Sequence, residues 1–243
     1  MMLSAHQSAY LPWLGLLQKV ARSDVFVYLD AVQFEKNSFS NRNRIKTPQG
    51  PLWLTVPVKA QGHTSATLND LVLDDAQPWR AKHLKSIEAN YCKAPHFDAC
   101  FAKLAGLLSP PTHSPQVTLA DFCWQELQFW LAEFGVRHTR LLRQSTLAPT
   151  GRKSDLVLDL CRQLGADHYL SGALGRDYLK LQDFKLASVE VSFQQFQHPV
   201  YPQRWGQFMP GLSVVDFWMN CGPDAARAWG HCDAAAAQEM ADA

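Results

Sequence analysis

Two short apolar runs near the start of the chain, each followed by polar residues, predict two buried strands of a parallel sheet. Leu3–Ala5 leads directly into His6, and Val25–Leu29 leads directly into Asp30. Between them, Leu14–Arg22 carries apolar residues at helical spacing. An apolar run without alternation suits a strand that is covered on both faces. The order strand, helix, strand therefore predicts a parallel unit at the start of the fold.

The rest of the chain shows the same two kinds of pattern. Helical spacing predicts helices at 79–91, 97–108, 119–134, 154–164 and 212–219. Strand-like runs cover 52–58, 71–73, 139–142, 169–172 and 189–196. The polar stretch 35–50 and the proline-rich and aromatic-rich stretch 198–211 predict loops. The helix at 154–164, followed by a glycine and a short strand, is typical of an αβ unit of a parallel sheet.

These elements predict an α/β fold: a Rossmann-like parallel sheet flanked by helices, with an additional helical portion at about 79–134. We expect residues 1–224 to form a single domain, and the alanine-rich stretch 225–243 to be a peripheral or disordered tail. Residues 109–115 contain three prolines, which suits either a linker or a helix–helix loop. The sequence shows no internal repeat.

Composition limits the class of protein. The chain has 243 residues, of which 47% are hydrophobic and 19% charged, as in ordinary soluble globular proteins. A formal net charge of +1 argues against a general nucleic-acid binder. No stretch is long and apolar enough for a membrane span. His6, Gln7 and Pro12 would interrupt the apolar region of a signal peptide. We therefore expect a cytoplasmic protein.

Cysteine and histidine spacing does not indicate a metal site. None of the six cysteines forms a C-x-x-C pair, so no zinc pattern is present. We expect all six to be reduced and structural, with Cys123 and Cys161 buried in helices. The histidines without ligand spacing are His63, His83, His96, His113, His138 and His231. We predict no metal.

Polar side chains follow the first two predicted strands, and they are the first candidates for chemistry. His6 and Gln7 come after one strand, and Asp30, Gln33 and Lys36 after the other. Ligands of parallel sheets bind beyond the carboxyl ends of the strands, so these groups are expected to meet at one rim. His6 is a candidate general base or oxyanion donor, since the pKa of histidine lies near working pH. The alternative is a histidine tied to backbone in a tight turn.

Two aspartates have both functional and structural interpretations. Asp30 ends a buried strand, where an unpaired carboxylate would be costly. We therefore expect it to pair with a cation, and Lys36, Arg42 and Arg44 are near in sequence. Such a pair is a candidate catalytic element or a structural one. Asp24 is a candidate substrate contact or a turn residue before the second strand.

The run Asn41-Arg42-Asn43-Arg44 is a candidate anion-binding loop, because guanidinium groups match carboxylates and phosphates. The alternative is a solvated charged face. A second candidate loop carries His198, Tyr201 and Gln203 between prolines, which lower the entropy cost of holding polar groups in place. Its alternative is an aromatic loop packed on the sheet. Tyr10 is a candidate substrate contact as a pocket wall, or a core residue.

Several short motifs, taken together and in order, resemble the WbqC-like family. The motifs are His6-Gln7, Tyr10-Leu11-Pro12-Trp13, Ser23-Asp24, Leu29-Asp30, Gln33, Lys36, Asn41-Arg42-Asn43, Trp53-Leu54-Thr55-x-Pro57-Val58, Tyr169-Leu170-Ser171-Gly172 and His198-Pro199-x-Tyr201-Pro202-Gln203. Ser8, Leu16 and Phe39 depart from the proline, aromatic residue and tryptophan usual in the family. The resemblance implies a bacterial protein of surface-polysaccharide (O-antigen) biosynthesis. It also implies transfer of glycine or a related acyl group onto an amino sugar.

On this reading His6 acts as the base, and Asp30 or His198 orients it or the nucleophile. Lys36, Arg42 and Asn43 would hold the anionic part of a substrate, possible examples being nucleotide sugars. The cofactor stays open between ATP and acyl-CoA.

A looser resemblance links the opening of the chain to the pantothenate synthetase and nucleotidylyltransferase group, which bind ATP on a Rossmann-like sheet. It implies that His6 meets phosphate and that Arg152-Lys153-Ser154 closes over it. Tyr10-Leu11-Pro12 occupies the place of that group's second histidine. The alternatives to transfer are therefore ATP-dependent activation of a carboxylate, and a non-catalytic assembly factor that would use surface aromatics such as Trp205.

Overall fold

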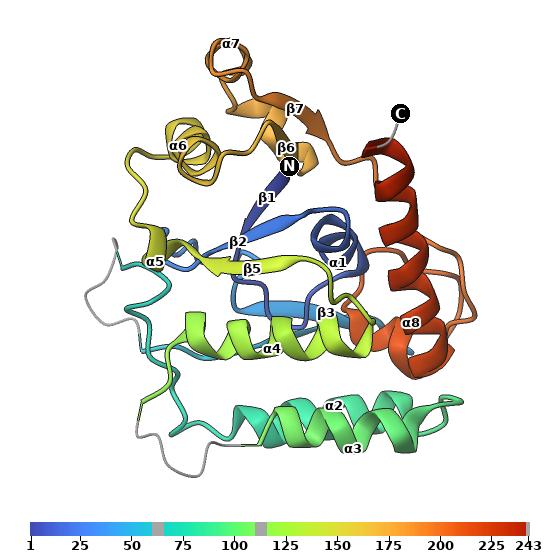
Figure 1. The fold of residues 1–243 in the computed structure, drawn as a ribbon. Coiled ribbons are helices and arrows are strands. Elements are labelled where there is room, and N and C mark those ends of the chain that lie inside the picture. The colour runs from blue at the N-terminus through green and yellow to red at the C-terminus, as the bar shows by residue number, and fades with distance from the viewer. Residues whose placement is uncertain (60–65, 110–115, 242–243) are drawn as a thin grey trace.

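A five-stranded parallel sheet forms the centre of the protein (Figure 1). The computed structural model describes residues 1–59, 66–109 and 116–241, with side chains up to residue 230. The strands are β1 (Met2–Gln7), β2 (Val25–Leu29), β5 (Arg140–Arg143), β6 (His168–Ser171) and β7 (Glu190–Phe193). They lie in the order β5-β2-β1-β6-β7, and every neighbouring pair is parallel. The predicted α/β fold with a Rossmann-like parallel sheet is confirmed.

Strand β2 and the first half of β1 are mainly apolar because both faces of the sheet are covered there. Leu3 and Val27 belong to a core cluster with residues of helix α6 (Ser154–Leu164). Phe26 and Tyr28, which alternate with Val27 along β2, belong to the other core cluster. Successive side chains of a strand point to opposite faces, so one five-residue run serves both clusters. This explains why β2 reads as a continuous apolar run rather than an alternating one.

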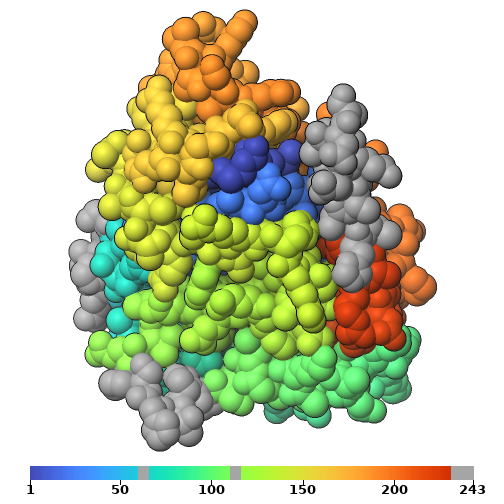
Figure 2. Space-filling model, in the orientation of Figure 1, coloured from blue at the N-terminus to red at the C-terminus, as the bar shows by residue number. Residues whose placement is uncertain are grey.

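Helices cover both faces of the sheet (Figure 1). On one side lie α1 (Leu14–Ala21) and α4 (Leu119–Glu133), and on the other α6 (Ser154–Leu164) and α7 (Leu181–Leu186). A further layer beyond α4 contains α2 (Trp79–Tyr91) and α3 (Phe97–Leu107), which with α4 make up the predicted helical portion. From the side shown in Figure 2, only a small area of the blue N-terminal residues is visible between the neighbouring segments. The first strands are therefore interior.

Short helical elements without a clear sequence pattern complete the fold. They are α5 (Gln144–Leu147) and the 3-10 helix η1 (Ala173–Asp177). The sequence analysis placed neither of them, nor α7. Four to six residues are too few for helical periodicity to show.

The stretch 35–50 was expected to be a loop, and this is wrong for its second half. Strand β3 (Arg42–Thr47) pairs antiparallel with β4 (Gly50–Thr55) in a separate hairpin. Pro48 and Gln49 join these strands, and Gly50, the first residue of β4, has a φ of 109°. Polar residues on both faces hid the strand: Asn43 is buried, whereas Arg42 lies half-buried on the other side.

The C-terminal helix α8 (Val214–Ala241) extends into the stretch where a peripheral or disordered tail was expected. It bends at Gly222, before Pro223, and then continues as a helix. Ala226 is fully buried, and the Trp229 ring lies 5.6 Å from that of Phe134. The first residues after 224 therefore pack on the core, because alanines allow a close approach to neighbouring helices. Of the helices in the described ranges, none is both long and apolar enough to cross a membrane.

Candidate functional site

The sheet order places a topological switch point between β1 and β6. The strand order is β5-β2-β1-β6-β7. The chain passes from β1 to β2 on one side and from β6 to β7 on the other, so the two connections run in opposite directions. Ligands of open α/β sheets bind in the crevice at this point, beyond the carboxyl ends of the strands. His6 and Gln7 are the last two residues of β1. Ser171 is the last residue of β6, and Gly172 follows it. The fold therefore directs attention to these residues before any chemistry is considered.

His6 is half-buried at the end of β1, and its hydrogen bond fixes the tautomer of its ring. Nδ1 of His6 lies 2.8 Å from the carbonyl oxygen of Gln7. A carbonyl only accepts, so Nδ1 carries the hydrogen. Burial, and next the charge of Lys19, lower the pKa of His6 to about 3. The ring is therefore neutral near pH 7, and Nε2 holds a free lone pair.

We expect His6 to stay neutral at about pH 5, where an ordinary histidine is mostly protonated. The ¹⁵N chemical shifts of Nδ1 and Nε2 measure this directly, and His6→Gln assigns the signals. Because the folded-state pKa is depressed below the ordinary 6.5, the contribution of His6 to stability is present above about pH 6.5. It is lost as the pH falls towards about 3. A titration midpoint near 6.5 would contradict the buried, neutral ring.

Lys19 is a site residue that the sequence analysis missed. It lies on α1 with only 3% of its surface exposed, and its amine donates to the carbonyl of Ala5 at 2.9 Å. Burial lowers the pKa of Lys19 to about 7. In the described ranges, no carboxylate forms an ion pair with this amine. The sequence signal was its place three residues after Leu16, on an apolar face of the helix.

A line of aromatic rings runs from His6 to the β3–β4 hairpin. The His6 ring lies edge-on to Trp13, with centroids 5.4 Å apart. Trp13 contacts Phe39 at 5.5 Å, and Phe39 contacts Trp53 at 5.6 Å. Phe39 and Trp53 are 38% and 40% exposed, so the outer end of this line is open to solvent. The end of β1 and the hairpin therefore belong to one surface.

Two arginines of β3 lie on this line. The guanidinium of Arg42 is 4.3 Å from the centre of the Trp53 ring, and that of Arg44 is 5.4 Å from it. Arg42 also donates to the side chain and the carbonyl of Asn37, and Arg44 donates to the carbonyl of Gly211 at 3.2 Å. Both side chains are half-buried. They form a positively charged, aromatic-backed patch.

The neighbouring asparagines are instead bound to the backbone. Asn41 donates to the carbonyl of Val56 at 2.9 Å, and Asn43 donates to that of Leu11 at 2.6 Å. Asn43 is 1% exposed, so its amide fixes the loop after β1 to the hairpin. Of the run 41–44, the structure places the two arginines outward and the two asparagines inward.

The loop that carries His198 reaches the start of α1 through an aromatic side chain. The Phe196 ring lies 3.0 Å, and the Trp13 ring 3.2 Å, from the position that a Cβ would take on Gly15. His198 contacts Phe196 with ring centroids 5.6 Å apart. Its Nδ1 lies 2.9 Å from the carbonyl oxygen of Pro199, as in His6. His6 and His198 are thus connected through Trp13 and Phe196.

Tyr201 and Gln203 lie inward, in a buried network around Asp216. Asp216 accepts hydrogen bonds from Tyr201 at 2.8 Å, from Gln203 at 2.8 Å and from Tyr91 at 2.7 Å. Lys46 donates to the amide oxygen of Gln203 at 2.9 Å. Burial raises the pKa of Asp216, against the lowering effect of these hydrogen bonds. These contacts anchor the loop 198–211 to the hairpin and to α8.

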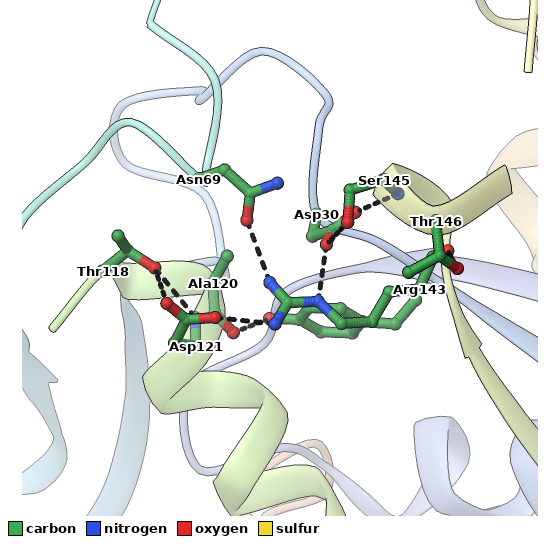
Figure 3. Close-up of polar contacts among 9 residues, drawn as sticks. Asp30, Asn69, Thr118, Ala120, Asp121, Arg143, Ser145 and Thr146 are labelled. Atoms are coloured by element: carbon green, nitrogen blue, oxygen red, sulfur yellow. Dashed lines mark hydrogen bonds and ion pairs between the residues drawn. The ribbon is translucent and has the colours of Figure 1, made fainter. Parts of the chain in front are cut away.

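Asp30 is fully buried at the end of β2 and pairs with a cation, as expected (Figure 3). Its carboxylate accepts from Arg143 Nε at 2.6 Å, and from the hydroxyl and backbone N–H of Ser145 at 2.6 and 2.9 Å. Burial alone would raise the pKa of Asp30, but the bonds from Ser145 and Arg143 outweigh it and lower the pKa. Arg143 also reaches Asp121 at 2.7 Å and Asn69 at 3.0 Å.

The expected source of the cation, Lys36, Arg42 or Arg44, is wrong. Arg143 comes from β5, which is the neighbour of β2 in the sheet although it is far away in sequence. Both carboxylate oxygens of Asp30 accept hydrogen bonds: Oδ1 from the backbone N–H of Ser145, and Oδ2 from Arg143 and from the hydroxyl of Ser145. Asp30 therefore lies at the predicted rim, in a saturated structural cluster.

Four further candidates lie outside the crevice. Tyr10 is fully buried and its hydroxyl lies 2.8 Å from Nδ1 of His83, within the core. Asp24 precedes β2, at the amino-terminal ends of the strands, and accepts from the backbone N–H of Met2 at 2.6 Å. Gln33 and Lys36 are exposed on the segment between β2 and the hairpin.

The cysteines described are all free, and Cys100, Cys123 and Cys161 are buried; the side chain of Cys232 lies outside the described residues. Within the described ranges, no group of three or more His, Cys, Asp or Glu side chains is arranged to hold a metal ion.

Comparisons with known proteins cover nearly the whole chain. A family model described as the WbqC-like protein family matches residues 7–228. The uncharacterized protein Rv1507c of Mycobacterium tuberculosis is 32% identical over 220 residues, which cover 90% of this chain and 93% of that protein. No solved structure gives a significant match. Because the family model matches residues 7–228, which include β6, the β3–β4 hairpin and the His198 loop, the chain belongs to the WbqC-like protein family.

Proposed function

We propose that this protein is a cytoplasmic transferase that moves a small acyl or aminoacyl group, such as glycyl, onto the amine of an amino sugar. Membership of the WbqC-like family is consistent with a role related to polysaccharides. The relative from Mycobacterium tuberculosis is uncharacterized and adds no activity. Support for the reaction comes from the site itself.

The observation that carries the proposal is the tautomer of His6 at the switch point: Nδ1 donates to the carbonyl of Gln7, which leaves the lone pair of Nε2 as the acceptor. An amine that attacks an acyl carbonyl must lose a proton as the new C–N bond forms. In our proposal Nε2 accepts a hydrogen bond from the N–H of the amine and then its proton, which passes to the leaving group as the bond from the carbonyl carbon breaks. Trp13 packs against the edge of the ring and limits its rotation. His198, with the same Nδ1 contact, is the second acceptor in our proposal.

The arginine patch supports an anionic acceptor. Arg42 and Arg44 present guanidinium groups beside the exposed Trp53 ring. Guanidinium groups bind phosphate well, and an exposed tryptophan face suits a sugar or a base. We propose that these groups hold a nucleotide sugar. Its amine would extend past Phe39 and Trp13 towards His6. Lys36, exposed on the segment between β2 and β3, would add charge.

His6→Gln is expected to reduce transfer by about 10²–10⁴-fold, because it removes the proton acceptor while it keeps a polar side chain of similar reach. Transfer of a glycyl or acetyl group to an amino-sugar nucleotide is measured by mass spectrometry. His138→Gln, at the C-terminal end of α1 with its ring bonded to the carbonyl of Ala21, is the matched control and should keep full activity. Equal activity of His6→Gln and the control would refute the proposed role.

A second candidate function is ATP-dependent activation of a carboxylate. It is favoured by the strand order and by Lys153, which directly precedes α6 and so lies at the rim where the strands end. Thermal-shift measurements with ATP, acyl-CoA, nucleotide sugars and glycine separate the two, since a ligand stabilises the state that binds it. Stabilisation by ATP alone favours activation, and stabilisation by a nucleotide sugar but not by ATP favours transfer. No stabilisation by any of them favours an assembly factor.

A further inference from the structure

Strands β1 and β6 separate before they end. Their pairing stops at Ser4 and Leu170, whereas β1 continues to pair with β2 as far as Gln7. Strand β6 likewise continues to pair with β7 as far as Ser171. The two strands therefore diverge at the switch point, and the backbone beyond Ser4 on this side has no strand partner.

The amine of Lys19 lies in this gap. It donates to the carbonyl of Ala5, the first residue of β1 beyond the pairing with β6. That bond uses one of the three donors of an ammonium group. A buried ammonium without a counter-charge is costly, and no described carboxylate pairs with this one. The gap thus contains a buried amine whose positive charge, when it is protonated, no carboxylate of the described residues balances.

Gly172 leaves open space directly in front of this amine. Its φ of −69° suits any residue, so the backbone does not require glycine here. A Cβ built on Gly172 would meet one heavy atom within 4 Å, the amine nitrogen of Lys19 at 3.9 Å. The absence of a side chain therefore keeps this position free beside the charge. The His6 ring lies close enough for the charge of Lys19 to affect it.

We propose that the gap between the carboxyl ends of β1 and β6 binds an oxyanion, a carboxylate or a phosphate, with the Lys19 amine as its counter-charge. The oxyanion enters beside Gly172 and completes the hydrogen bonding of the ammonium group. As an account of where a substrate's anionic group lies, this rests on the proposed function. The binding itself is measurable without any transfer.

Titration calorimetry with sulfate and with acetate tests the proposal, because neither probe changes its charge near neutral pH. The wild-type protein is expected to bind at least one of them. Lys19→Met is expected to weaken that binding at least about tenfold, since it removes the charge and keeps the length of the side chain. Lys180→Met, which removes an exposed lysine paired with Asp155, is the matched control and should bind as the wild type does.

Gly172→Ala provides a second test that does not depend on removing a charge. Its Cβ makes an ordinary contact, so the thermal midpoint should stay unchanged while probe binding weakens. Binding of sulfate alone identifies phosphate as the ligand chemistry, and binding of acetate alone identifies carboxylate. Absence of binding to the wild type, or equal binding by Lys19→Met, overturns the proposal. Probe binding that depends on Lys19 in a protein without transfer activity would refute the proposed function and leave this inference intact.

Discussion

Replacing Arg143 with methionine is expected to lower the free energy of unfolding by about 3–5 kcal/mol, which is the usual cost of breaking a buried ion pair from one side. The change leaves the carboxylate of Asp30, which is 0% exposed, with Ser145 as its remaining donor. It also removes the bridge from β5 to Asp121 on α4. Urea unfolding followed by tryptophan fluorescence measures the loss.

The double variant Asp30→Asn/Arg143→Met separates an unpaired charge from lost packing. Its loss of unfolding free energy should be smaller than the sum of the losses of the two single variants. Arg143→Met leaves the carboxylate unpaired, and Asp30→Asn removes that carboxylate. Lys180→Met, at an exposed ion pair, should leave the midpoint unchanged. A loss for Arg143→Met no larger than that of this control would show that the cluster contributes little to stability.

The same cluster predicts how the protein responds to acid. The folded-state pKa of Asp30 is depressed, so its stabilising contribution is present above the ordinary value of 3.8. That contribution is lost as the pH falls through the lowered folded-state pKa. In the Arg143→Met variant this acid loss should shrink, because the carboxylate has already lost its charged partner.

The sequence predicted the central sheet well because its strands are buried on both faces. Continuous apolar runs such as 25–29, with polar residues at both ends, leave little alternative to a strand of a parallel sheet. Strand β3 could not be recognised in this way, because its buried residues include Asn43 and Lys46 as well as Ile45. Its pairing with β4, rather than its own apolar pattern, makes it a strand.

The candidate site was predictable only where it follows from the rule for parallel sheets. His6 and Asp30 were expected at one rim; His6 is the last but one residue of β1, and Asp30 directly follows β2. The partner of Asp30 could not be deduced, because Arg143 becomes a neighbour only when β5 joins β2. Lys19 was overlooked for a related reason: its importance depends on the divergence of β1 from β6, which no local pattern reveals.

The loop that carries His198 is held by a buried carboxylate. Asp216 is 0% exposed, and three donors from two parts of the chain meet on it: Tyr91 of α2, and Tyr201 and Gln203 of the loop. All three point at one carboxylate, so its removal leaves several buried donors unsatisfied at once. Losses of this kind are larger than those from a single hydrogen bond.

Asp216→Ala is therefore expected to lower the free energy of unfolding by about 3 kcal/mol or more, whereas Tyr201→Phe, which removes one donor, should cost about 1 kcal/mol. Amide hydrogen exchange should also become faster across 198–211 in Asp216→Ala than in Tyr201→Phe, since the loop loses its anchor to α2 and α8. Urea unfolding and exchange mass spectrometry measure the two effects. Equal losses in the two variants, with unchanged exchange in the loop, would mean that Asp216 does not hold His198 beside Phe196.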